Sequence, residues 1–202
     1  ATGGTTRPGA CTAGYYCPEG SEASSLFSGP GDQSFCPPGS QCYCPPGRYS
    51  AATNLMSYDE CTLCPASFYC SGGGTTPSGP CQAGYFCPNG TAGATDNPCP
   101  AGTYSNATDL YDDEQCTVCP VGHFCVSAST SPAECPAGTY ANTTGTTAQG
   151  LCNACPPGYY CPQGTVDPVP CGVGYYSSWS ASSCTGCPVG AYCPTNTTTD
   201  TE

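Results

Sequence analysis

The sequence predicts a tandem array of small disulfide-rich repeats, irregular with short β-hairpins, elongated and rod-like, with little or no helix. Two observations predict this fold class. Of 202 residues, 22 are cysteine, a fraction above the roughly 8–10 % that is typical of disulfide scaffolds. The cysteines also recur in steps of 36 residues, from Cys99 to Cys135 to Cys171. Such self-similarity indicates repeats that contact mainly their neighbours along the chain.

Large apolar side chains are too few to form an ordinary hydrophobic core. The chain has 5 Leu, 7 Val, 5 Phe and no Ile, whereas a domain of this length normally buries most of its apolar surface. With 27 Gly and 23 Pro, it would be expected to stay disordered without cross-links. We therefore expect disulfide cross-links to order the chain. Their number also predicts a secreted protein in an oxidising, extracellular or cell-surface location.

The charge balance excludes some partners. There are 14 acidic residues against two basic ones, Arg7 and Arg48, so we expect no binding of nucleic acid or of an anionic membrane. The segment contains no apolar run long enough to span a membrane. Residues 1–10 do not have the features of a signal peptide, and the match between 3–11 and 73–81 predicts that the chain is part of a longer array.

A seven-residue motif, C-x-x-G-x-[FY]-C, underlies the repeat, and we call each occurrence a hook. The pattern occurs in full at Cys11–Cys17, Cys81–Cys87, Cys119–Cys125, Cys155–Cys161 and Cys187–Cys193. Two variants, Cys64–Cys70 and Cys36–Cys42, have Ser67 for the glycine and Gln41 for the aromatic residue. Four more hooks open at Cys44, Cys99, Cys135 and Cys171 and end in Ser or Ala. Proline after the cysteine and glycine two residues later favour a tight turn.

The eleven hooks suggest how the cysteines pair. Two hooks, 11–17 and 81–87, are extra pieces with two cysteines each, so the economical interpretation is that a hook ending in cysteine closes on itself. This accounts for Cys11–Cys17, Cys36–Cys42, Cys64–Cys70, Cys81–Cys87, Cys119–Cys125, Cys155–Cys161 and Cys187–Cys193. The remainder then pair as Cys44–Cys61, Cys99–Cys116, Cys135–Cys152 and Cys171–Cys184. Links such as Cys125–Cys135 or Cys87–Cys99, which would join neighbouring units, are the alternative.

The aromatic residue before the closing cysteine is expected to pack over the bridge or on the adjoining unit. These residues are Tyr16, Tyr69, Phe86, Phe124, Tyr160 and Tyr192. The resulting domain organisation has partial repeats and a Gly/Ser/Pro-rich spacer at 1–43. The repeats then occupy 44–98 (with the extra hook 81–87), 99–134, 135–170 and 171–202.

The pattern C-P-A-G-T-Y-S…C-x-x-C-P-x-G-x-[FY]-C, clear over 44–193, resembles the GCC-type, ephrin-receptor-like cysteine-rich repeat and, more distantly, the tumour-necrosis-factor-receptor module. The resemblance implies an ectodomain or, in long arrays, a large surface protein of a protist or alga. It implies no particular ligand. Residues 1–43 depart from the pattern.

Four C-x-x-C motifs raise the alternative of a zinc site, with Cys61, Cys64, Cys116 and Cys119 as the obvious ligands. Their separation in sequence is far greater than in a zinc ribbon. The even number of cysteines and the extracellular composition favour disulfides. We expect no metal and no cofactor.

An acidic segment could bind a hard cation such as calcium. Its residues are Asp109, Asp112, Asp113 and Glu114, with a weaker counterpart at Asp59 and Glu60. Calcium requires six to eight oxygen ligands from a shaped loop, and two of the four repeats lack these carboxylates. A solvated acidic face is the favoured interpretation.

Catalysis is not expected. The single histidine, His123, occupies a variable hook position held elsewhere by Tyr15 or Phe68. With one His and no Lys, the usual parts of nucleophilic and acid–base catalysis are missing. The chain is predicted not to be an enzyme.

Glycosylation is the strongest functional signal. The sequon N-x-[ST] occurs at Asn89, Asn106, Asn142 and Asn196, and in a secreted protein such sites are surface acceptors of glycans. Asn106 and Asn142 lie 36 residues apart, at one phase of the repeat. Threonine clusters at 143–147 and 197–199 could carry O-linked sugars or be plain spacers.

Two functional hypotheses arise from these features. The first is a glycosylated structural segment of an extracellular fibre, cell-surface appendage or coat, whose partners are neighbouring copies of itself or adjoining repeats. The alternative is the stalk or ligand-binding ectodomain of a cysteine-rich receptor or adhesion protein.

Overall fold

The computed structural model describes residues 11–17 and 42–198. The chain divides into two units, one within 1–97 and 107–115 and the other within 98–106 and 116–202. Each unit is built from hooks of the kind that the sequence predicts. In the part that the structure describes, no helix is long and apolar enough to cross a membrane.

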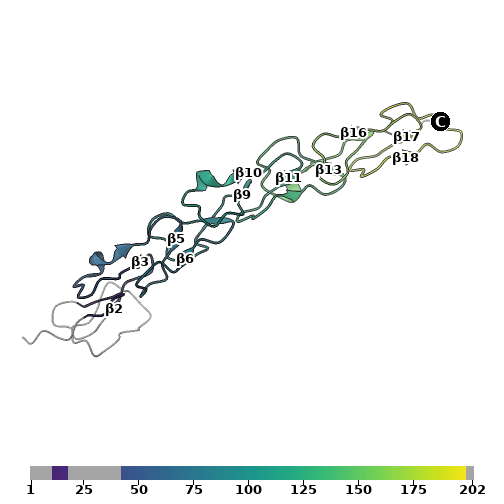
Figure 1. Cartoon of the computed structure of the whole chain (residues 1–202). Helices are drawn as coiled ribbons and strands as arrows, with labels where there is room; N and C mark the ends of the chain where they lie inside the picture. The colour runs from purple at the N-terminus through teal and green to yellow at the C-terminus, as the bar shows by residue number, and fades with distance from the viewer. Residues whose placement is uncertain (1–10, 18–41, 199–202) are drawn as a thin grey trace, which may run out of the picture. The chain divides into compact units, whose positions relative to one another are not determined.

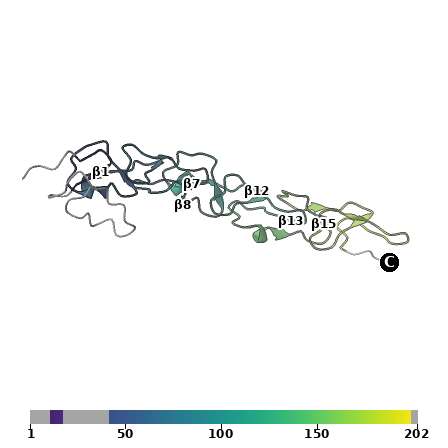
Figure 2. The ribbon, with the colours of Figure 1, turned by 90° about the horizontal axis from the view of Figure 1, so that it is seen from below.

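Secondary structure consists of two-residue strands and single 3-10 turns (Figures 1 and 2). In the first unit these are β1 (Tyr15–Tyr16), β2 (Cys42–Tyr43), β3 (Arg48–Tyr49), η1 (Tyr58–Glu60), β4 (Thr62–Leu63), β5 (Phe68–Tyr69), β6 (Gly79–Pro80) and β7 (Tyr85–Phe86). β8 (Asn97–Pro98) contains the point at which the units divide. η2 (Asp113–Gln115) belongs to the first unit.

The second unit repeats the same elements. They are β9 (Thr103–Tyr104), β10 (Thr117–Val118), β11 (His123–Phe124), β12 (Ala133–Glu134), β13 (Thr139–Tyr140), η3 (Gln149–Leu151), β14 (Asn153–Ala154), β15 (Tyr159–Tyr160), β16 (Val169–Pro170), β17 (Tyr175–Tyr176) and β18 (Thr185–Gly186). The predicted fold class, small disulfide-rich repeats with short antiparallel hairpins and almost no helix, is confirmed for the described residues.

Eight hooks in the described part of the chain use the same strand register. The fifth and sixth residues of each pair antiparallel with the two residues that precede the opening cysteine of the next described hook. Thus Thr139 pairs with Ala154 and Tyr140 with Asn153, and the same offset recurs in β11–β12 and β15–β16. One pairing rule therefore serves hooks of different sequence.

Within each unit, main-chain hydrogen bonds tie each described hook to the next. The opening cysteine donates its N–H to the carbonyl of the glycine in the preceding hook, as in Cys135 to Gly122 at 2.9 Å and Cys155 to Gly138 at 2.9 Å. That glycine donates in turn to the last residue of the following hook, as Gly138 does to Cys161 at 2.7 Å. Because only the backbone takes part, the register tolerates changes of side chain.

The first hook is followed in space by the hook that opens at Cys44. Cys44 donates its N–H to the Gly14 carbonyl at 2.8 Å, and β1 pairs with β2, with Tyr16 opposite Cys42. The intervening residues 18–41, which include Cys36, lie outside the described part of the chain.

Cysteines form most of the buried interior. Twelve of them are the largest fully buried side chains among the described residues, and few aliphatic side chains join them, such as Leu55 and Leu110. Disulfides therefore replace hydrophobic packing, as the composition predicts.

Candidate functional site

Ten disulfides join the described cysteines, and each is a pair that the hook count predicts. Six of them close hooks over a separation of 6 residues. Three close rings with a separation of 17 residues, and Cys171–Cys184 closes one of 13. The predicted Cys36–Cys42 bridge includes a residue outside the described part. The two cysteines of every C-x-x-C motif belong to different bridges, which leaves these motifs without thiolates for zinc.

Eight of the loops that follow described hooks contribute a residue that we call the cover residue. It donates its N–H to the opening cysteine of the preceding hook, as Gly164 does to the Cys135 carbonyl at 2.9 Å and Ser180 to the Cys155 carbonyl at 2.8 Å. Cover residues have positive φ, from 57° at Ser180 to 81° at Gly90. A hook with a cover residue is thus held by two later segments of the chain, the next hook and the loop that follows it.

The carbonyl of the cover residue packs against the glycine of the hook two positions earlier. A Cβ on Gly122 would lie 2.5 Å from the Gly164 oxygen, and a Cβ on Gly102 would lie 2.7 Å from the Gly145 oxygen. The hook glycine is therefore required twice, once for its positive φ of 75° at Gly122 and once for this close approach.

Ser67 occupies the glycine position of its hook, with φ of 71°. Its Oγ donates a hydrogen bond of 2.6 Å to the main-chain oxygen of Asp109. Asp109 lies in the loop that covers this hook, since the adjacent Leu110 accepts a hydrogen bond from the Cys87 N–H at 2.9 Å. The serine therefore bonds a carbonyl from the loop that elsewhere packs directly on glycine.

Two of the aromatic residues that precede a closing cysteine, Phe124 and Tyr16, belong to clusters of buried residues around the bridge of a later hook. Phe124 packs against Cys135, Ala141 and Cys152. Tyr16 is buried in a cluster with the Cys44–Cys61 bridge. This burial raises the pKa of Tyr16, and the electrostatic effect of the neighbouring Tyr58 raises it further. Tyr192 differs from this pattern, because it is 70 % exposed.

Exposed apolar side chains gather in the last two described hooks, which open at Cys171 and Cys187. Val173 and Val189 in these hooks, and Trp179 in the loop after the first of them, are all more than 60 % exposed. In the same hooks, a Cβ on Gly174 or Gly190 would meet nothing within 4 Å. No cover residue therefore packs on these two glycines among the described residues.

The acidic segment is organised by its own hydrogen bonds. Asp112 accepts from the Glu114 N–H at 2.9 Å and so caps η2, as Ser57 caps η1 by accepting from the Asp59 N–H at 3.3 Å. The bond from Glu114, followed by bonds from Asp113, lowers the pKa of Asp112. Within the described ranges, no group of three or more His, Cys, Asp or Glu side chains is placed to hold a metal ion.

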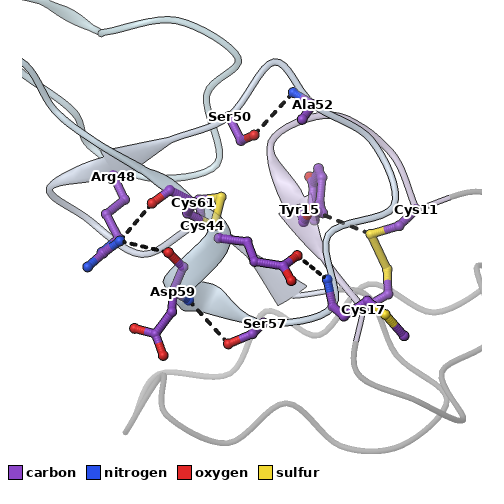
Figure 3. Close-up of a disulfide and its surroundings, with 12 residues drawn as sticks. Cys11, Tyr15, Cys17, Cys44, Arg48, Ser50, Ala52, Ser57, Asp59 and Cys61 are labelled. Carbon is purple, nitrogen blue, oxygen red and sulfur yellow. Dashed lines mark hydrogen bonds between the residues drawn. A yellow bond between two sulfur atoms is a disulfide. The ribbon is translucent and has the colours of Figure 1, made fainter.

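Arg48 lies beside the Cys44–Cys61 bridge and forms hydrogen bonds at the end of η1 (Figure 3). Its guanidinium donates to the Cys61 carbonyl at 2.7 Å and to the Asp59 carbonyl at 3.4 Å. A positive charge at the carbonyl end of a helical turn is favourable. This basic side chain thus has a local structural contact, one that sequence reasoning missed because nothing marks it in the motif.

His123 lies in β11, opposite Glu134 of β12. Its Nδ1 is 2.9 Å from the Val121 carbonyl oxygen, two residues away in the same hook. A donating Nδ1–H satisfies this contact, so the ring is held by the hook itself.

All four sequon asparagines have exposed side chains, but their loops differ. Asn106 and Asn142 directly follow hooks that end in Ser105 and Ala141, inside the larger rings closed by Cys99–Cys116 and Cys135–Cys152. Asn89 and Asn196 lie in short loops after cysteine-closed hooks. Asn196 is itself a cover residue, with φ of 62° and its N–H bonded to the Cys171 carbonyl at 3.2 Å.

Comparisons with protein-family models and with curated proteins find no match to this chain. Its functional interpretation rests on the repeated hooks, their contacts and the surface that they expose.

Proposed function

We propose that this chain is a glycosylated structural segment of an extracellular fibre, cell-surface appendage or coat. Its partners are neighbouring copies of itself or adjoining repeats, and catalysis is not part of its role. The resemblance to ephrin-receptor-like repeats belongs to the same proposal. The observation that carries it is the repeated main-chain register, in which hooks within each unit bond the next hook and a cover residue further along.

That register supports a structural role because it propagates. Each hook presents the same donors and acceptors to the next hook, whatever its side chains, so a further hook can always be added in the same way. Contacts of this kind that do not close into a ring build extended assemblies. Some side chains of the ring loops, such as those of Asn106 and Asn142, are exposed and so available for display.

The disulfides support an extracellular setting. Ten bridges among the described residues need an oxidising compartment to form and persist. They also replace the missing hydrophobic core, so the segment keeps its order when diluted outside a cell.

The exposed side chains of the last two hooks support contact through apolar surface. The chain carries 14 acidic and two basic residues, and like-charged chains repel within a Debye length of about 10 Å at 0.1 M salt. Val189 and Trp179 carry no charge, so contact through these side chains adds no charge repulsion of its own. We propose that these side chains contact a neighbouring copy of the chain or an adjoining repeat.

Electron microscopy of the oxidised chain at physiological salt, with and without a chelator, tests the proposal. Filaments are expected in both conditions. Val189→Asp, which adds charge to this exposed apolar surface, should shorten or abolish them, whereas Leu151→Asp, at another exposed apolar position on η3, should not. Dispersed monomers in all samples would contradict the fibre and favour the receptor stalk. Filaments lost only on chelation would instead assign the contact to cations at the acidic segment.

A further inference from the structure

The four sequons fall into two structural settings, and this difference bears on when each can be modified. N-linked transfer requires the asparagine amide together with the hydroxyl of the residue two positions later, since the motif demands both. The accessibility of that hydroxyl and the freedom of the main chain therefore matter as much as exposure of the asparagine.

The sequon of Asn89 is closed by folding. Its hydroxyl residue, Thr91, is only 7 % exposed, and the Oγ1 donates to the Pro88 carbonyl at 2.7 Å. The main chain is held as well: Gly90 donates to the Cys64 carbonyl at 2.9 Å, and the Thr91 carbonyl accepts from the Cys70 N–H at 3.0 Å. All of these contacts must break before the sequon can be presented in another conformation.

The hydroxyl residue of the Asn196 sequon, Thr198, is exposed, but the main chain of this sequon is held by the same kind of loop. Its main chain bonds Cys171 at 3.2 Å, and the Thr197 carbonyl accepts from the Ser177 N–H at 3.2 Å. The acceptor amide nitrogen, Nδ2, lies 3.4 Å from the Tyr159 hydroxyl. The Asn196 carbonyl also packs over Gly158, so rotation of this residue would disturb a neighbouring hook.

The sequon of Asn142 is open. Asn142, Thr143 and Thr144 are all exposed, and among the described residues these three make no main-chain hydrogen bond to a neighbouring hook. Asn106 occupies the equivalent position, and its hydroxyl residue, Thr108, is also exposed. These two sequons stay accessible after the hooks have formed.

We infer that folding sorts the sequons: Asn106 and Asn142 accept glycans on the folded chain, whereas Asn89 and Asn196 accept them only before their hooks close. This inference rests on the glycan display in the proposed function and adds an order to it. Transfer forms a bond from Nδ2 to the anomeric carbon of the sugar. It breaks the bond from that carbon to the diphosphate of a lipid-linked donor, which leaves with the electron pair, while the amide loses one proton.

The consequence is that occupancy at Asn89 and Asn196 reports the competition between glycan transfer and disulfide formation. Slow oxidation leaves time for four glycans, and fast oxidation leaves two. Local opening of a loop that main-chain hydrogen bonds hold against neighbouring hooks is a minor state, so the expected suppression in the folded chain is about tenfold or more, the population ratio of a modest local opening.

The test presents the full chain to purified oligosaccharyltransferase and a lipid-linked oligosaccharide, once oxidised and folded and once reduced and alkylated. Glycopeptide mass spectrometry measures each site. We expect all four sites to be modified in the reduced chain, and Asn89 and Asn196 to fall at least about tenfold in the folded chain while Asn106 and Asn142 do not.

Two variants make the test specific. Cys81→Ala with Cys87→Ala opens the hook before Asn89 and should raise its occupancy in the folded chain. Cys155→Ala with Cys161→Ala removes a bridge of the same separation elsewhere and should leave Asn89 suppressed. Equal modification of Asn89 and Asn142 in the folded chain would overturn the sorting alone. Failure of all four sites in the reduced chain would overturn the sorting and the glycan display together.

Discussion

The Ser67 Oγ donates a 2.6 Å hydrogen bond to the main-chain oxygen of Asp109, which lies 42 residues further along the chain. Ser67 stands where other hooks have glycine, at a positive φ of 71°. A side chain at this position is expected to obstruct the covering loop, yet here it holds the loop by a hydrogen bond. One departure from the motif is thus compensated by a contact that the motif itself does not contain.

Replacing Ser67 separates the two effects of its side chain. Ser67→Ala keeps the strain of positive φ and loses the hydrogen bond, so it should destabilise the first unit by about 1 kcal/mol. Ser67→Gly loses the bond but relieves strain of roughly 1 kcal/mol, so it should be close to neutral. Hydrogen exchange of the Cys87 amide, which bonds Leu110 in the same loop, measures both. Faster exchange in the glycine variant than in the alanine variant would contradict this account.

The hook glycines differ in what surrounds them, which provides a matched pair. Gly122→Ala adds a Cβ 2.5 Å from the Gly164 oxygen, whereas Gly174→Ala meets nothing within 4 Å. Both carry the cost of positive φ, about 1–2 kcal/mol. Gly122→Ala should cost a further 1–3 kcal/mol or so through the forced shift of the main chain. Thermal unfolding of the oxidised variants compares them, and equal losses would show that the close approach is not required.

Bridges of different ring size should contribute differently to stability. In the chain-entropy description, a separation of 6 residues is worth about 2 kcal/mol and one of 17 about 3 kcal/mol. Replacing Cys135 and Cys152 by alanine should therefore destabilise the second unit more than replacing Cys119 and Cys125. Phe124 adds to the difference because it packs on the larger bridge. Denaturant unfolding of both double variants measures it, and a reversed order would count against the entropic description.

The caps of η1 and η2 should respond differently to acid. The pKa of Asp112 is lowered in the folded chain, so its contribution is present above the unfolded pKa of about 3.9 and is lost as pH falls through the folded value. The Ser57 cap carries no charge. Nuclear magnetic resonance should show the Glu114 amide signal shifting in this acidic range while the Asp59 amide reports no loss of the Ser57 cap. Loss of both caps together would indicate general unfolding instead.

The sequence could predict the hooks and their bridges because cysteine and glycine carry that information directly. Two isolated hooks with two cysteines each pointed to local closure, and Cys81–Cys87 is one of them. The cover residues could not be predicted in the same way. Ala128, Ser180 and Asn54 are cover residues with positive φ, as Gly164 is. Hydrogen bonds to neighbouring hooks impose this conformation, and the residue types alone do not predict it.

The acidic segment shows a second limit of sequence reasoning. Composition alone leaves a cation site and a solvated face open, since both use the same carboxylates. The structure assigns one of them, Asp112, to the cap of η2 through the Glu114 N–H. The capping role depends on a two-residue spacing shared with Ser57 and Asp59, a signal visible only when the two turns are aligned. The closed state of the Asn89 sequon likewise depends on the burial of Thr91, which no motif reveals.

Because a cover residue reaches back only to the two preceding hooks, the dependence of any hook on the rest of the chain is short. A coding segment of one 36-residue period, copied or lost by recombination between equivalent positions, would leave every remaining hook with neighbours of the kind it already has. The number of repeats can therefore change between alleles while every hook keeps its contacts. The length of the chain then becomes a heritable quantity that selection can change in steps of one repeat.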